Sequence, residues 1–133
     1  MTKLELKNHQ VWQDLTEILE NIDTNALVTE HLELCDYKVC GYWDSNDNFF
    51  EQIILPRSLS AELISSSVGT TQKSRWIQLK FILKADINSF DELSNTNSQK
   101  IGELSLIFDE NMEFIDETWQ IDIGSPFLIT KCE

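Results

Sequence analysis

The stretch GELSLIFDENMEFIDETWQIDI, residues 102–123, decides the fold because it reads as two β-strands joined by a turn at residues 109–111. Leu104 and Leu106 alternate with polar residues, the pattern of a strand that buries one face. In the return strand, Ile115 and Trp119 share a face, but Phe114 has the opposite parity. We therefore expect an antiparallel hairpin with a β-bulge near residues 114–115.

A turn closed on residues 110–111 would set the register of this hairpin. Leu106 would then lie opposite Ile115, and Gly102 opposite Trp119, so that the indole covers a glycine. Glu117 would fall on the apolar face of the return strand, whereas Asp116 would point outward.

The same stretch carries seven carboxylates and no Lys or Arg. The whole chain has a formal net charge of −13, and residues 101–133 contribute −7 of it. Such a field repels nucleic acid and anionic membranes and attracts a cationic partner. Two tryptophans near polar or basic neighbours could add apolar anchors. The candidate partner-binding residues are Glu103, Asp109, Glu110, Glu113, Asp116, Asp122, Trp43 and Trp76.

The rest of the chain completes one domain, residues 1–133. Helical spacing predicts a helix over residues 9–21 and a second over 24–34, and residues 58–66 suggest a short third one. Residues 36–56 read as a hairpin and 76–84 as a clear strand, whereas 68–71 break the chain. Residues 86–99 read as a polar loop, and residues 127–129 as an edge strand. This order predicts an α+β fold with N-terminal helices on one face of a curved antiparallel sheet.

No catalytic, cofactor or metal motif is recognisable in the sequence. The segment Asp44-x-Asn46-x-Asn48 begins like a calcium loop but lacks the required glycine and final carboxylate, so an Asx turn is the better interpretation. Cys35, Cys40 and Cys132 have no zinc or disulfide spacing, and the histidines His9 and His31 have no nucleophile nearby in sequence. We therefore expect a non-enzymatic protein without metal or cofactor, with reduced thiols in the cytoplasm.

Two resemblances bear on function. The turn Phe108-Asp109-Glu110-Asn111-Met112 and the return strand closing near Glu117-Thr118-Trp119 are similar to the last hairpin of the NTF2-like family of cone-shaped α+β proteins. That resemblance implies a pocket between helices and sheet, with Glu117 as its polar group, although no Asp/His dyad is recognisable. A small, acidic, motif-free single domain also resembles bacterial toxin-immunity proteins of the contact-dependent or polymorphic type.

The leading hypothesis is therefore an acidic protein that neutralises a basic partner, a nuclease toxin domain, by occupying its active-site cleft or an exosite. The alternative is an NTF2-like ligand-binding protein or enzyme with a pocket near Glu117. A third hypothesis, a DNA mimic, is disfavoured because such proteins spread negative charge over the whole surface, whereas residues 1–100 contain nine Lys and Arg.

Overall fold

A computed structural model describes residues 9–86 and 98–131, and the described chain contains two helices followed by seven strands. The helices are α1 (Gln10–Glu20) and α2 (Thr24–Leu34). The strands are β1 (Lys38–Trp43), β2 (Phe49–Ile54), β3 (Leu59–Thr70), β4 (Arg75–Asp86), β5 (Ser98–Asp109), β6 (Phe114–Ile121) and β7 (Ile129–Lys131). The prediction of an α+β fold with N-terminal helices is confirmed.

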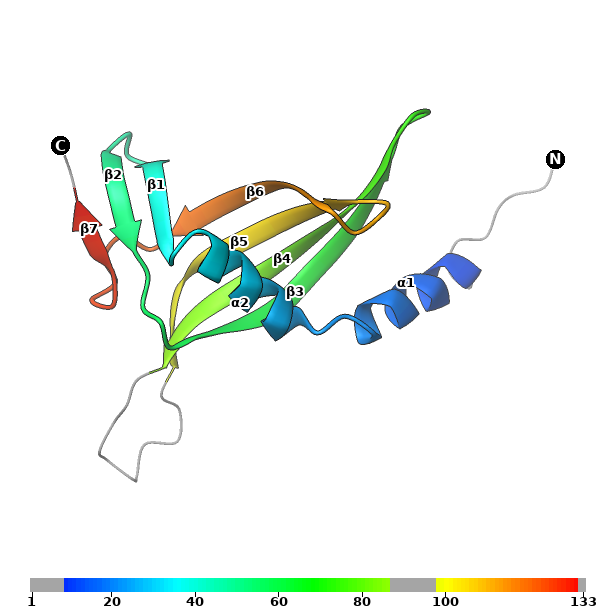
Figure 1. Ribbon diagram of the computed structural model, residues 1–133, viewed down its shortest axis with the longest axis horizontal. Helices are drawn as coiled ribbons and strands as arrows, with labels where there is room; N and C mark the ends of the chain where they lie inside the picture. The colour runs from blue at the N-terminus through cyan, green and yellow to red at the C-terminus, as the bar shows by residue number, and fades with distance from the viewer. Residues whose placement is uncertain (1–8, 87–97, 132–133) are drawn as a thin grey trace, which may run out of the picture.

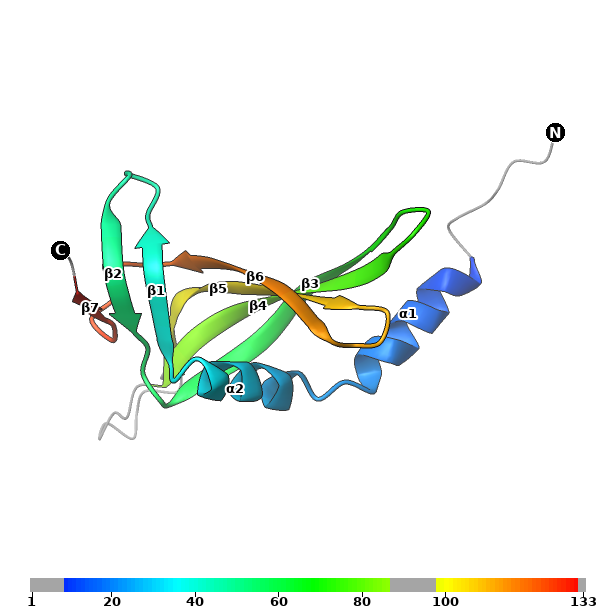
Figure 2. The ribbon, with the colours of Figure 1, turned by 45° about the horizontal axis from the view of Figure 1, so that its top comes forward.

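The strands form two antiparallel sheets, one ordered β1-β2-β7 and the other β3-β4-β5-β6. Figures 1 and 2 show the smaller sheet standing at one end of the larger one, with α2 lying over a face of the larger sheet. The Tyr42 hydroxyl in β1 accepts a hydrogen bond from the Ile121 N–H at the end of β6, over 2.9 Å. This bond ties the two sheets together where they meet.

The core is built on β4, whose side chains alternate strictly between a buried and a half-buried face. The buried face consists of Ile77, Leu79, Phe81, Leu83 and Ala85. Val28 and Leu32 of α2 are buried against the same cluster, as are Leu104 and Leu106 of β5. Because alternate residues of a strand point to opposite faces, this burial fixes which side of the sheet faces outward.

Strand β3 corrects the prediction of a third helix over residues 58–66 and of a break at 68–71. This segment pairs with β4 along its whole length, from Leu59 opposite Ala85 to Thr70 opposite Arg75. A bulge between Leu63 and Ser65 changes the parity of the strand. The apparent helical spacing of the apolar residues is therefore produced by a bulged strand, and pairing with β4 overrides local propensity.

The predicted polar loop over residues 86–99 is shorter than expected. Asp86 pairs with Ser98 and Ala85 with Gln99, so β4 and β5 extend into both ends of the predicted loop. Residues 87–97 lie outside the described residues. The edge strand predicted over 127–129 is displaced to Ile129–Lys131, where it pairs with β2.

Local hydrogen bonds explain where other elements begin and end. Asp23, the residue before α2, accepts a hydrogen bond from the Ala26 N–H and caps the start of the helix. Asp44 accepts the backbone N–H groups of Asn46 and Asn48, which confirms the predicted Asx turn between β1 and β2. The Asn48 N–H lowers the pKa of Asp44 below its ordinary value.

Of the cysteines, Cys35 is half-buried and Cys40 is exposed. Cys132 lies outside the described residues. The structure describes no helix that is long and apolar enough to cross a membrane.

Two glycines should differ in their tolerance of a methyl group. A Cβ added at Gly102 would lie 2.6 Å from the backbone oxygen of Gln120, whereas one at Gly69 would meet only the Trp76 indole, at 2.1 Å. Because an indole can rotate away and a paired strand cannot, Gly102→Ala should lower the free energy of unfolding by about 2 kcal/mol more than Gly69→Ala. Urea denaturation measures the difference.

Gly124→Ala is the matched control, because its added Cβ would make an ordinary 3.5 Å contact. We expect that substitution to change stability by less than about 0.5 kcal/mol. Equal losses for Gly102→Ala and Gly69→Ala would show that the close approach of β5 and β6 is not the constraint described here.

Candidate functional site

The β5–β6 hairpin is closed by the side chain of Asp109, which accepts hydrogen bonds from the N–H groups of Asn111 and Glu113 at 2.9 and 3.0 Å. The turn is completed by a backbone bond from the Asp109 N–H to the Glu113 carbonyl. Met112 in this turn has a φ of 61°, a conformation that favours glycine. The turn thus spans residues 109–113 and is wider than the sequence predicted.

The register of the hairpin corrects the prediction. Leu106 lies opposite Glu117, and Gly102 opposite Ile121, two residues further along β6 than expected. One residue of this shift comes from the wider turn, and the other from a bulge next to Phe114, where a bulge was indeed predicted. Trp119 consequently faces Leu104, and the indole that covers a glycine is Trp76, opposite Gly69.

The two faces of β6 are as predicted for its central residues. Glu117, Trp119 and Ile121 are half-buried, whereas Asp116, Thr118 and Gln120 between them are exposed. Asp116 accepts a hydrogen bond from the N–H of Glu117, and Asp122 accepts one from the N–H of Gly124. Backbone contacts therefore hold both carboxylates in place without neutralising their charge.

Glu103 differs from the other candidate residues because its charge is matched inside the protein. It forms ion pairs with Lys100 at 2.9 Å and with Lys80 at 3.3 Å, and its side chain is 19% exposed. The hydrogen bond from Lys100 is the main cause that lowers the pKa of Glu103 from its ordinary value of 4.5. Glu103 therefore adds little net charge to the outer face of the sheet.

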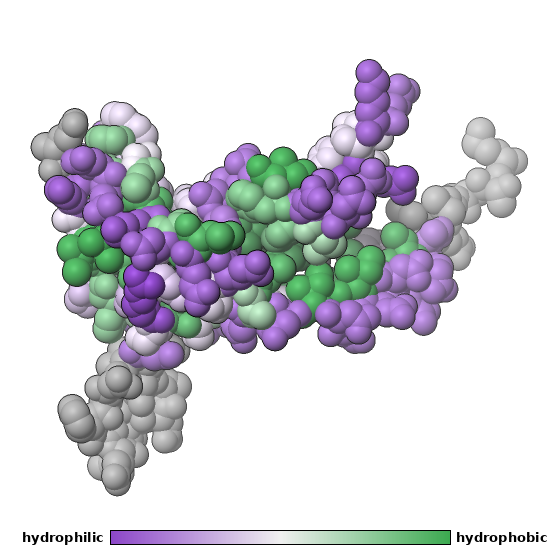
Figure 3. Space-filling view, in the orientation of Figure 1, coloured by the Kyte–Doolittle hydropathy of each residue, from purple (hydrophilic) through white to green (hydrophobic). Residues whose placement is uncertain are grey.

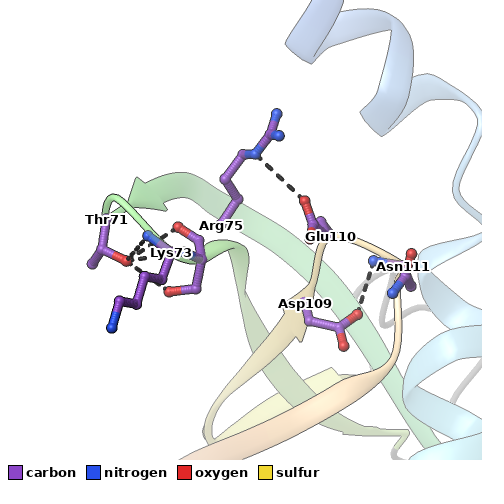
Figure 4. A network of polar contacts seen from close by, with 7 residues as sticks. Thr71, Lys73, Arg75, Asp109, Glu110 and Asn111 are labelled. Atoms are coloured by element: carbon purple, nitrogen blue, oxygen red, sulfur yellow. Dashed lines mark hydrogen bonds and ion pairs between the residues drawn. The ribbon is translucent and has the colours of Figure 1, made fainter.

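Glu110 is partly matched as well. Its carboxylate lies 3.4 Å from the guanidinium of Arg75, so an ion pair bridges the ends of the β3–β4 and β5–β6 hairpins (Figure 4). Both partners are well exposed, at 72% for Arg75 and 55% for Glu110. Such a pair contributes little to stability, roughly 0–1 kcal/mol, and a stronger partner could replace it.

Ion pairing within residues 9–86 and 98–131 leaves a large excess of carboxylates. Six of the eight Lys and Arg in these segments pair with Asp or Glu, and the exceptions are Lys73 and Lys131. Of the candidate carboxylates, those without a cationic partner are Asp109, Glu113, Asp116 and Asp122. They follow the β5–β6 turn and β6, and we call them the hairpin carboxylates.

Five of the eight candidate residues line two surface grooves at the two ends of β6. One groove is lined by Trp43 and Asp122, together with Asp44 and Trp119. The other is lined by Trp76, Asp109 and Asp116, together with the apolar Ile107 and Ile115. The structure thus brings each tryptophan next to at least one hairpin carboxylate, but it does not bring the two tryptophans together.

The two tryptophans are exposed to different degrees. Trp43 is 62% exposed and packs its ring against Phe49 at a centroid distance of 4.9 Å. Trp76 is half-buried, and its indole fills the space left by Gly69. Trp43 therefore offers more apolar surface to a partner than Trp76 does.

A contact that the sequence did not reveal joins α2 to β6. The imidazole of His31 makes a short contact with the carboxylate of Glu117 through Nε2 and Oε2. The His31 ring lies 4.9 Å from Phe114 and 6.4 Å from Trp119, measured between centroids. The sequence shows no recognisable Asp/His dyad, and the structure instead pairs this histidine with a glutamate 86 residues away in sequence.

This pair has a clear structural role. Glu117 sits on the otherwise apolar face of β6 with its side chain 36% exposed, and the less exposed His31 contacts it from α2. Neither groove described above is lined by the two side chains. In the sequence, the only signal was a carboxylate on an apolar face together with a histidine on a helix.

Within the described residues, no group of three or more His, Cys, Asp or Glu side chains is arranged to hold a metal ion. Comparison of the chain with protein-family models, with curated proteins and with solved structures found no match. The resemblances to NTF2-like and immunity proteins therefore stay predictions, and the function must be argued from the surface itself.

The coupling between His31 and Glu117 can be measured with a double-mutant cycle. We expect His31→Ala and Glu117→Ala each to destabilise the fold, and the double variant to lose about 1 kcal/mol less than their sum, because each single change leaves one polar group without its partner. Glu33→Ala, an exposed residue of the same helix, is the control. Additive losses would show that the contact does not hold α2 on the sheet.

Proposed function

We propose that the protein binds and neutralises a basic protein partner, and that it acts as the immunity protein of a bacterial nuclease toxin. The observation that carries this proposal is the row of hairpin carboxylates, Asp109, Glu113, Asp116 and Asp122, for which the described chain provides no cation. Backbone N–H groups hold three of these four carboxylates, those of Asp109, Asp116 and Asp122, so they form a preorganised surface for cationic side chains.

The inhibition would follow from charge and shape together. A nuclease holds its substrate in a cleft lined with Lys and Arg, which neutralise phosphates. A rigid row of carboxylates that occupies the cleft, or an exosite beside it, excludes the nucleic acid and is drawn to the nuclease by long-range attraction. Single exposed ion pairs contribute only about 0–1 kcal/mol each, so tight binding also requires an apolar centre. Trp43 and Trp76 are placed to provide it.

The alternative proposal is an NTF2-like ligand-binding protein or enzyme that uses Glu117. One observation favours it: a carboxylate that contacts an imidazole is a pair suited to general acid–base chemistry. The surroundings favour a structural role, because α2 covers the sheet here and His31 is only 13% exposed. We therefore propose binding, and not catalysis, as the activity.

The proposal is tested with tagged protein used to capture partners from its source cell at low and high salt, followed by mass spectrometry. We expect one stoichiometric basic protein, and we expect high salt to weaken the complex because counterions screen exposed charges. The variant Asp116→Lys with Asp122→Lys should reduce capture at least tenfold, which corresponds to about 1.4 kcal/mol.

The matched control is Glu30→Lys with Glu33→Lys, which changes the net charge equally on exposed positions of α2. We expect it to capture the partner nearly as well as the unaltered protein. Equal loss in both variants would mean that only total charge matters. Absence of any partner, together with a small molecule retained on purification, would contradict the proposal and favour a pocket near Glu117.

A further inference from the structure

Helix α1 is amphipathic, yet none of its residues is buried. Leu15 and Leu19 are half-buried against the core, whereas Val11 is 45% exposed and Ile18 is 48% exposed. Figure 3 shows hydrophobic surface along the side of α1 that faces the sheet and hydrophilic surface on its other side. A helix with this pattern ordinarily covers its apolar stripe, so α1 presents a face that the described chain leaves partly open.

The open face of α1 borders a groove at the end of the larger sheet, which we call the α1 groove. Leu15 and Ile18 form its wall on the helix. Val68, Ile77 and Met112, from the ends of the two hairpins, form the opposite wall. In Figure 2, α1 continues past this end of the sheet beside the β5–β6 turn.

Exposed apolar side chains occur on both walls of this groove. Of the eleven large hydrophobic residues that are well exposed in the described chain, three line it. They are Ile18, Val68 and Met112. Exposed apolar residues scattered singly are ordinary, but a contiguous patch with a polar rim marks an interaction site.

The rim of the α1 groove is acidic. Asp109 and Glu110 line the groove, and Asp109 has no cationic partner in the described chain. Glu113 is exposed in the same β5–β6 turn, and Asp14 is exposed on α1. Arg75, the cation that lines the groove, is paired with Glu110 (Figure 4). Lys73, in the turn between β3 and β4, is the other positive charge near this end.

We infer that the α1 groove binds an apolar segment of a protein partner flanked by Lys or Arg. The apolar walls match the hydrophobic residues of such a segment, and the acidic rim matches its basic ones. This inference rests on the proposed function, which gives the partner a positive charge. It adds the place where an apolar part of that partner binds.

The charge also argues against the other occupants of an apolar face. A second copy of this chain would bring the same carboxylates and a further net charge of −13 to the interface. Like charges placed opposite one another at an interface disfavour association. An anionic lipid surface would be repelled for the same reason. A cationic segment with apolar residues at helical spacing is the occupant for which both the walls and the rim are complementary.

Three synthetic 14-residue peptides provide the test, with binding to the full chain measured by titration calorimetry. The first has Leu and Lys at amphipathic helical spacing, the second has Glu in place of Lys, and the third keeps Lys but has Ser in place of Leu. We expect the Leu/Lys peptide to bind at least about tenfold more tightly than either of the others, because it alone matches walls and rim.

Two variants of the protein locate the bound peptide. Met112→Gly removes a wall side chain and relieves its positive φ, so the variant should fold at least as stably as the original. Ile18→Ser removes apolar surface from the opposite wall at an exposed helix position. We expect each to weaken binding of the Leu/Lys peptide by roughly fivefold or more, whereas Ile129→Ser, on exposed β7, should leave it unchanged.

Three outcomes would overturn the inference. They are equal binding of the Leu/Lys and Lys/Ser peptides, unchanged binding in Met112→Gly and Ile18→Ser, and a dimer of the free chain that Ile18→Ser dissociates. The proposed function fails separately. If a basic partner is captured, and only charge reversal at Asp116 and Asp122 weakens its capture, the proposed function is supported and the inference about the α1 groove is wrong. If Met112→Gly and Ile18→Ser weaken peptide binding but no basic partner is captured, the α1 groove binds such segments and the proposed function is wrong.

Discussion

The burial of alternate side chains along β4 is the constraint on which the rest of the structure depends. Leu79, Phe81 and Ala85 are fully buried, and β4 is paired on both sides along most of its length. A slip of one residue would turn these side chains to solvent. The burial of β4 also determines which residues of the neighbouring strands face outward. Glu103 and Asp116 face outward because Leu104 and Leu106 must face inward.

The sheet therefore sorts the carboxylates into two groups. Glu103 lies next to Lys80 across the strand pair and near Lys100 on its own strand, so its charge is satisfied inside the protein. Asp116 and Asp122 project where the described chain supplies no cation, and backbone N–H groups hold them in place. The unmatched carboxylates on the outer surface of β6 are therefore the basis of the proposed function.

Local patterns predicted the elements that depend on local chemistry, and long-range contacts decided the rest. The two helices, the Asx turn at Asp44 and the strand around Phe81 were predictable from spacing and turn residues. β3 was not predictable from these signals, because a bulge interrupts the alternation of its apolar residues and pairing with β4 decides its structure. The hairpin register depended on a wide turn at Asp109, and the contact between His31 and Glu117 joins distant segments, so no local pattern contains it. The acidic residues are visible in the sequence, but their division into those with and those without a cationic partner required the positions of the lysines.

Hydrogen exchange of the free protein and of its complex with a captured basic partner tests the central claim most directly, because it reports where the partner covers the backbone. Our account predicts that protection on binding is concentrated in β6, the turn at residues 109–113 and α1. Protection confined to the sheet β1-β2-β7 or to the outer side of α2, with β6 unchanged, would contradict the claim that the hairpin carboxylates form the binding surface.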